Sequence, residues 1–235
     1  MRKKLGSRQP IFNKRGVSLI ELMIALAFCG IVIGSIYRVF ISHTRIYAVQ
    51  DEVVEVQQSI RGAMEILLRD LRMAGFQTST FGSGLITSGA IIVDPNNNSH
   101  ITVNYEYMGG AAPTVYTVDY IVDNQGNLNR TLTPAGSPAV KETILENVKT
   151  LTFTYGIDAN GDGIIDGIDT ATGLTPDSAF VSAANVGTAK VLAIRVFLVA
   201  NPSPVNPDVT TMVSPRTLTS VVTPRNLLIK KYQAY

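Results

Sequence analysis

The chain has 235 residues, a formal net charge of +2 and a single cysteine, Cys29. Six basic residues and no acid precede residue 17, so the rest of the chain keeps 14 basic residues against 18 acidic ones. The basic balance is thus a property of the N-terminal leader and does not favour nucleic-acid binding. A lone cysteine also excludes an intrachain disulfide.

The leader, residues 1–16, is followed by an apolar stretch from Val17 to Ile41 that holds one acid, Glu21. As a helix this stretch would be roughly 37 Å long, enough to cross a bilayer core of about 30 Å. The positive-inside rule keeps the basic leader in the cytoplasm and sends the remainder outward. Since a carboxylate in lipid is costly, Glu21 is expected to have a cationic partner. Cys29 is expected to act as a small, buried apolar side chain.

The run Gly16-Val17-Ser18-Leu19-Ile20-Glu21, followed by the apolar helix, resembles the processing site of type IV prepilins and type II secretion pseudopilins. The resemblance implies that a prepilin peptidase cuts between Gly16 and Val17. It also implies that the new N-terminal residue, Val17, is methylated, and that Glu21 sets the register of subunits in a filament. The chain has Val17 where the family most often has phenylalanine.

Two other interpretations compete for this N-terminus. A secretory signal would carry a small-residue cleavage site after the apolar segment and no acid within it. A plain membrane anchor explains the length and the basic flank, but neither Gly16 nor Glu21.

Beyond the membrane segment, apolar residues recur at spacings of three and four, which predicts an amphipathic helix. They are Val49, Val53, Val56, Ile60, Met64, Leu67 and Leu71. The polar residues between them, from Asp51 to Asp70, are expected to face solvent. Gly75 is suited to end the helix. The pattern therefore predicts one helix over residues 17–74 whose second half packs on a globular head.

After Gly75 the sequence favours β-structure. Alternating apolar residues predict strands at residues 101–107, 150–155 and 191–199. A short apolar run at 89–93 and the segments 115–122, 128–132 and 218–222 are also expected to be strands. A turn is expected at 123–126. We therefore predict an α+β, pilin-like fold, in which the long N-terminal helix packs on a mostly antiparallel β head over residues 75–235.

Further segments extend the resemblance to PilW-type minor pilins and their type II secretion relatives. They are residues 69–76, 146–156, 191–199 and 224–226. The resemblance implies a minor pilin that primes or joins a type IV pilus, with a role in adhesion or motility left open. The alternatives are a minor pseudopilin of a type II secretion system and a membrane-anchored ligand-binding module.

The resemblance also implies partners and a location. The expected partners are the prepilin peptidase, the major pilin, other minor pilins, the inner-membrane assembly platform and the lipid bilayer. No nucleic acid is expected. The protein would cross the inner membrane once, with its leader cytoplasmic and its head periplasmic, and would then reach the pilus at the cell surface.

Residues 158–169 fit a twelve-residue calcium loop, with a glycine at the sixth position, where such a loop turns sharply. The expected ligands of one Ca²⁺ are Asp158, Asn160, Asp162, the backbone carbonyl of Ile164, Asp166 and Asp169. An Asp/Gly-rich surface turn is the alternative.

Enzyme signatures are missing from the sequence. No GxSxG, HExxH, CxxC or phosphate-binding glycine loop occurs. The two histidines, His43 and His100, lie far apart and have no catalytic motif around them. An enzyme is therefore not expected.

Overall fold

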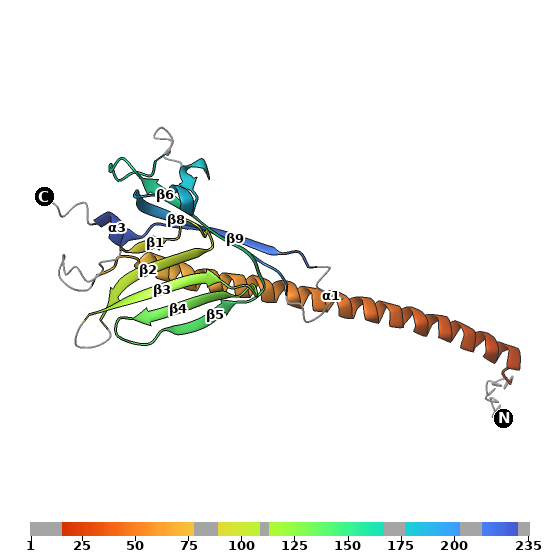
Figure 1. The fold of residues 1–235 in the computed structure, drawn as a ribbon. Helices are drawn as coiled ribbons and strands as arrows, with labels where there is room; N and C mark the ends of the chain where they lie inside the picture. The colour runs from red at the N-terminus through yellow and green to blue at the C-terminus, as the bar shows by residue number, and fades with distance from the viewer. Residues whose placement is uncertain (1–15, 78–88, 109–112, 167–176, 203–212, 230–235) are drawn as a thin grey trace, which may run out of the picture. The chain divides into compact units, whose positions relative to one another are not determined.

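The computed structural model describes residues 16–77, 89–108, 113–166, 177–202 and 213–229. Contacts within the chain divide it into two units, residues 1–48 and residues 49–235. The first unit contains the N-terminal part of helix α1, and the second contains the rest of α1 and the β-rich head (Figure 1).

Helix α1 spans Leu19–Met73, 55 residues, against the predicted 17–74. It begins later than predicted because the Ser18 carbonyl accepts the N–H of Leu22 at 3.1 Å, while residues 16–18 are not helical. Serine is favoured at that flanking position. The helix ends at Met73, just before the predicted stop at Gly75, whose φ is 72°. A Cβ on Gly75 would lie 2.8 Å from Cδ2 of Leu227, so a side chain there would have to displace Leu227 and would also strain the backbone.

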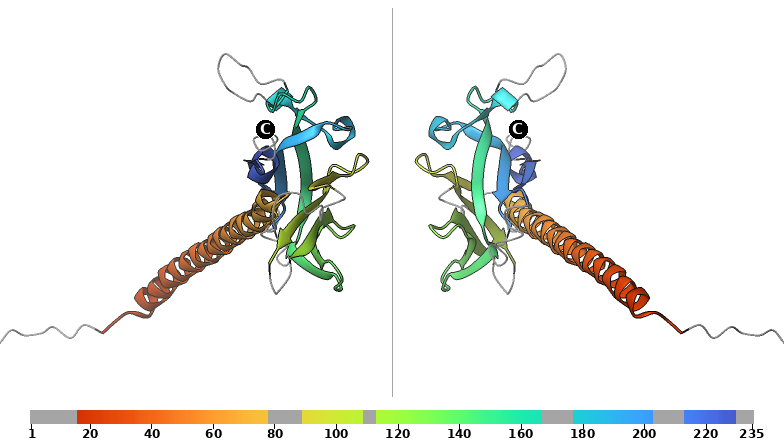
Figure 2. Two further views of the ribbon diagram at one scale, coloured as in Figure 1. Left: turned by 90° about the vertical axis from the view of Figure 1, so that its left-hand side faces the viewer. Right: turned by 90° about the vertical axis from the view of Figure 1, so that its right-hand side faces the viewer.

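Among the described residues of the head, nine strands form two antiparallel sheets. The first sheet has the order β1-β2-β3-β4-β5, with β1 Ile91–Val93, β2 His100–Tyr107, β3 Thr114–Val122, β4 Leu128–Pro134 and β5 Val140–Leu145. The second has the order β7-β6-β8-β9, with β6 Val148–Asp158, β7 Phe180–Val181, β8 Lys190–Ala200 and β9 Arg216–Val222. Two short 3-10 helices, Asp177–Ala179 and Ala183–Asn185, and helix α3, Arg225–Ile229, complete the described elements. The first sheet runs from yellow-green to green and the second from teal to blue in Figures 1 and 2.

One hydrophobic core joins the second half of α1 to both sheets. Val56, Ile60, Met64, Leu67 and Leu71 of the predicted stripe are all buried in it. They pack with side chains of the first sheet, including Ile101, Val103 and Val118, and of the second, including Phe153, Ile194 and Leu198. Helix and antiparallel sheets together confirm the predicted α+β, pilin-like class.

A turn between β1 and β2 connects the two sheets. The Asn98 carbonyl accepts the N–H of Phe153 in β6 at 2.8 Å, and its side-chain oxygen accepts the N–H of Ala183 at 3.0 Å. The Ser99 hydroxyl donates to the Leu151 carbonyl at 2.6 Å. The position of this turn therefore affects both sheets.

Each of the seven predicted strands corresponds to an observed one, with ends shifted by up to three residues. The predicted turn after β3 is confirmed: the Asp123 carboxylate accepts the N–H groups of Gln125 and Asn127, and Gly126 has a φ of 80°. These backbone donors, led by Asn127, lower the pKa of Asp123 to about 2. Strands β5 and β7 and helix α3 were not predicted.

Candidate functional site

The processing motif lies at the junction between extended chain and helix. Gly16, Val17 and Ser18 are outside regular secondary structure, and Glu21 lies in the first turn of α1. The peptide bond between Gly16 and Val17 is thus in a non-helical segment, which a peptidase can bind without unwinding α1. An acid in the first turn also interacts favourably with the helix dipole.

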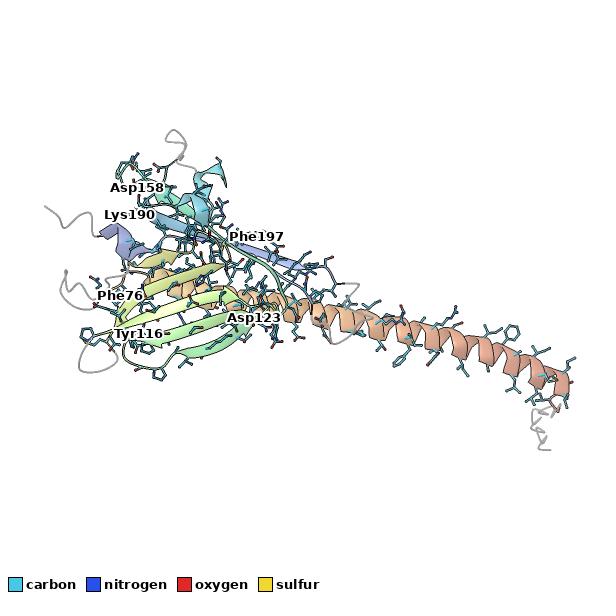
Figure 3. The ribbon with its side chains drawn as sticks, viewed as in Figure 1. Phe76, Tyr116, Asp123, Asp158, Lys190 and Phe197 are labelled. Carbon is cyan, nitrogen blue, oxygen red and sulfur yellow. The ribbon has the colours of Figure 1, made fainter. Side chains whose placement is uncertain are left out.

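The first half of α1 presents apolar side chains on every side. The large apolar side chains from Val17 to Phe40 are all more than half exposed, and the side chains project from the helix on all sides in Figure 3. The hydroxyl of Ser35 donates to the Ile31 carbonyl at 2.8 Å, so this polar group is satisfied within the helix. By length and composition, α1 is the one helix in the described part of the chain that can span a bilayer. A surface of this size requires lipid or other helices around it.

The predicted burial of Cys29 is not provided by the described part of its own chain. Its side chain is exposed on α1, like its apolar neighbours. Burial of Cys29 must come from lipid or from another subunit.

The predicted calcium loop follows β6, whose last residue, Asp158, is labelled in Figure 3. The Asp158 carboxylate accepts the N–H of Gly161 at 2.6 Å and that of Gly163 at 2.8 Å. Asn160 and Asp162 each accept a backbone N–H two residues ahead, at 2.9 and 2.7 Å. Gly163 has a φ of 84°, so the sixth position makes the sharp turn that the sequence predicted.

The far side of this loop is fastened to the second sheet. The Asp166 carboxylate accepts the N–H of Ala159 at 2.7 Å, and the N–H of Asp166 donates to the Ile157 carbonyl at 2.8 Å. Ile165 packs over Gly156 in β6, where an added Cβ would lie 3.0 Å from Cδ1 of Ile165. The loop is therefore attached to the end of β6 by hydrogen bonds and by side-chain packing.

The donor set of the loop is of the kind that Ca²⁺ prefers. Carboxylate and amide oxygens carry two lone pairs each, so one accepted N–H leaves an oxygen able to bind a cation. Within residues 158–166 no group of three or more acidic, histidine or cysteine side chains is arranged to hold a metal ion. Ile164 lies in this loop, whereas Asp169 is outside the described residues. Calcium binding thus stays a prediction.

A buried charge network, which the sequence did not indicate, joins α1 to the first sheet. Asp70 is 3% exposed, so placing it on the solvent side of α1 was wrong. Its Oδ2 accepts the Tyr120 hydroxyl and the Nε–H of Arg130, both at 2.7 Å. Burial, together with the charge of Asp70, raises the pKa of Tyr120 and keeps this hydroxyl a donor. Arg130 Nη1 also lies 3.7 Å from Glu142 Oε2.

His100 makes a second unpredicted network beside the turn that joins the sheets. Its Nε2 lies 2.6 Å from Asp119 Oδ1 and its Nδ1 lies 3.3 Å from Asp94 Oδ2. The Thr102 hydroxyl donates to the same Asp119 oxygen at 2.7 Å. Partial burial alone would lower the pKa of His100, but the two carboxylates outweigh it and raise the pKa above its ordinary value. The other histidine, His43, lies exposed on α1.

This geometry predicts that His100 stabilises the head most in mildly acidic solution. Because its pKa is raised in the folded state, the contribution is complete below the unfolded pKa of about 6.5 and is lost as pH rises through the folded value. We expect His100→Gln to lower the melting temperature of residues 49–235 clearly at about pH 5.5 and little at about pH 9. The loss in free energy of unfolding at the two pH values should differ by up to about 1 kcal/mol.

The matched control is Asp119→Asn, which removes the closer carboxylate and should flatten the same pH dependence. An equal loss of stability in His100→Gln at both pH values would show that the histidine acts only as a neutral hydrogen-bonding group.

Comparison with known families agrees with the processing motif and with the head. A model described as the prokaryotic N-terminal methylation motif matches residues 11–37, which include Gly16, Val17 and Glu21. A model described as Type IV Pilus-assembly protein W matches residues 115–229, from β3 to the end of α3. Together the two matches cover more than half of the chain. No curated protein is significantly similar to it.

Both families consist of structural pilus components rather than enzymes. The motif at the start of α1, the exposed apolar helix and the matching β head therefore agree, and the chain belongs to the type IV pilin-like proteins, as a minor pilin related to PilW.

Proposed function

We propose that this minor pilin primes or joins a type IV pilus. It is inserted in the inner membrane through α1, with the leader in the cytoplasm and the head in the periplasm. Prepilin peptidase removes residues 1–16, Val17 is methylated, and the subunit enters the filament and reaches the cell surface.

The observation that carries this proposal is the exposed apolar half of α1, which begins at the processing motif. An apolar surface that the chain itself leaves uncovered is stable in lipid before assembly and against other helices after it. The same surface thus serves both states. The partners that fit it are the bilayer, the major pilin and other minor pilins, delivered through the inner-membrane assembly platform.

Glu21 gives the proposal a specific test. We propose that its carboxylate pairs with the N-terminal amine of a neighbouring subunit, because that amine exists only after processing and offsets the cost of a carboxylate in an apolar surrounding. In a strain lacking the chromosomal copy, Glu21→Ala is expected to insert into the membrane normally but to be reduced about tenfold or more in sheared filaments.

Immunoblots of membranes and of sheared filaments measure both quantities. The control is Ser35→Ala, because Ser35 lies in the same exposed segment and bonds only within its helix. Normal incorporation of Glu21→Ala would remove the assembly role of Glu21. If deleting the chain leaves surface pili unchanged and abolishes exoprotein secretion, the subunit belongs to a type II secretion pseudopilus.

We further propose that the loop from Asp158 to Asp169 binds one Ca²⁺ and that the ion stabilises the head. The backbone bonds to Asp158 and Asp162 support this proposal, since they hold oxygen ligands in a tight loop that Ile165 fastens to β6. Sites that face the outside bind with a Kd on the order of 10⁻⁴–10⁻³ M. A hundredfold excess of Ca²⁺ over that Kd would stabilise the folded state by about 2.7 kcal/mol.

Thermal unfolding of residues 49–235 in Ca²⁺, in Mg²⁺ and in chelator tests this site. We expect the melting temperature to rise with Ca²⁺ in the native head and not in Asp162→Ala. Asp123→Ala is the control, because Asp123 forms another Asx turn outside the loop. Equal melting temperatures of the native head in Ca²⁺ and chelator would reduce the loop to an acidic turn.

A further inference from the structure

The loop after β6 contains the one asparagine–glycine step of the sequence, Asn160-Gly161. An asparagine side-chain amide can react with the backbone nitrogen of the next residue, and glycine has no side chain to obstruct that approach. Both residues are exposed, and Asp158, labelled in Figure 3, lies where the loop leaves β6. Water, which the reaction consumes, therefore reaches this step.

The conformation of the loop requires glycine at position 161. Its φ is 81°, in the left-handed region that residues with a side chain adopt only at a cost. Among the described residues, a Cβ on Gly161 would meet no atom within 4 Å, so conformation rather than space selects glycine here. The turn thus retains the reactive step.

The Asn160 side chain is folded back onto the peptide that follows it. Its Oδ1 accepts the N–H of Asp162 at 2.9 Å, and its Nδ2 donates to Asp162 Oδ2 at 3.1 Å. The ring closed by the first bond contains both the amide carbon of Asn160 and the nitrogen of Gly161, so this Asx turn keeps the two atoms together. The same N–H of Asp162 would stabilise negative charge that develops on Oδ1 during attack.

We propose that Asn160 converts spontaneously to aspartate and isoaspartate in the folded head. The Gly161 nitrogen gives up its proton to hydroxide and bonds to the amide carbon of Asn160. Nδ2 then leaves as ammonia, with a proton taken from water. The cyclic imide adds one water at either of its carbonyls and opens, which restores the Gly161 N–H and leaves a new carboxylate. Water is the only co-reactant.

Asp158 protects this step. Its Oδ1 accepts the N–H of Gly161 at 2.6 Å, so the proton that must leave is held by a hydrogen bond to a charged acceptor. The negative charge of that carboxylate also disfavours negative charge on the nitrogen beside it. Loss of Asp158 should therefore speed the conversion.

Conversion changes both the charge and the backbone of the loop. A new carboxylate at position 160 adds to those of Asp158, Asp162 and Asp166, and like charges this close repel one another. Isoaspartate also inserts an extra carbon atom into the main chain, which alters the spacing on which the turns of the loop depend. The modification is independent of filament assembly and of Ca²⁺ binding.

Mass spectrometry of the full-length native protein, kept in detergent with chelator in mildly alkaline buffer, tests the proposal. Digestion after increasing times shows where NH has been replaced by O, and isoaspartyl peptides elute separately from aspartyl ones. Asn124 is the internal control, because it is exposed and followed by Gln125, whose N–H donates to the Asp123 carboxylate at 2.9 Å. We expect at least about tenfold faster conversion at Asn160 than at Asn124, since Gln125 has a side chain and Gly161 has none.

Conversion at Asn160 no faster than at Asn124 would overturn the proposal. The appearance of aspartate without isoaspartate would also overturn it, because direct hydrolysis of the amide gives aspartate alone, whereas the cyclic imide opens to both.

Two variants separate the protecting bond from general loosening of the loop. Asp158→Ala frees the N–H of Gly161, whereas Asp166→Ala frees that of Ala159 and leaves the bond to Gly161 in place. We expect Asp158→Ala to raise the rate of conversion about fivefold or more and Asp166→Ala to raise it less than about twofold. Equal increases in the two variants would remove the protecting role of Asp158.

Discussion

Asp70→Ala is expected to destabilise the head by about 3–5 kcal/mol, which is a large part of the stability of an ordinary domain. The substitution removes the one carboxylate that accepts both the Tyr120 hydroxyl and the Arg130 guanidinium. Tyr120 is fully buried and Arg130 is 8% exposed, so water does not replace the lost acceptor. A buried guanidinium without its counter-charge is the main source of the loss.

The two arginines that touch Asp70 should differ sharply in effect. Arg130→Met is expected to cost nearly as much as Asp70→Ala, because it leaves the carboxylate buried with the Tyr120 hydroxyl alone. Arg69 lies 3.6 Å from the other oxygen of Asp70, but its side chain is 66% exposed. Arg69→Met should therefore cost no more than about 1 kcal/mol.

Urea unfolding of residues 49–235 measures these differences. Arg69→Met serves as the control, because it removes the same charge from the same carboxylate at an exposed site. If Asp70→Ala lowers the free energy of unfolding no more than Arg69→Met does, water must enter the network and solvate Arg130. Replacing Asp70 by leucine together with Arg130→Met and Tyr120→Phe should recover much of the lost stability, since apolar groups of similar volume leave no unpaired charge.

Periodicity was sufficient to predict the elements that bury one face. The stripe from Val49 to Leu71 repeats every three or four residues, and β8 carries apolar residues along its whole length. By contrast β5 is mostly exposed, and the hydrogen bonds of β4 hold it in place, so its sequence has no apolar alternation. Helix α3 has five residues, too few for a helical period to show.

The networks of Asp70 and His100 depend on register, which no local pattern reveals. Asp70 is separated from Tyr120 by 50 positions and from Arg130 by 60. These two residues meet it because β3 and β4 pair Tyr120 directly with Arg130. In the sequence, Asp70 was one acid among several on a polar side of a helix. Only the placement of that helix against the sheet shows that its side chain is buried.

The processing motif, in contrast, could be recognised from consecutive residues, and residues 11–37 match the N-terminal methylation motif. The calcium loop could be predicted from the sequence only in part. Its turns are local and agree with the structure from Asp158 to Asp166. Its closure by Asp169, outside the described residues, remains a prediction.

Gly16→Val is expected to slow removal of the leader by about a hundredfold, the size of effect that misplacing a scissile bond can have. In the resemblance to prepilins the peptidase depends mainly on this glycine, and a branched side chain next to the scissile bond would obstruct it. Among the described residues, a Cβ on Gly16 would meet no atom within 4 Å, so we expect no effect of the substitution on the described fold. Any loss of processing must then arise in the complex with the peptidase.

Gly30→Val provides the matched control. Gly30 lies in the exposed apolar part of α1, and a Cβ there also meets nothing within 4 Å. Mass spectrometry of the membrane-bound protein should find the native chain and Gly30→Val beginning at methylated Val17, and Gly16→Val beginning at the leader. Since methylation needs the new amine of Val17, the uncut variant should also lack the methyl group. It should then be absent from filaments even with Glu21 intact, because the amine proposed to pair with that carboxylate never forms. Normal cleavage of Gly16→Val would show that the peptidase recognises the apolar helix and the basic leader rather than the glycine.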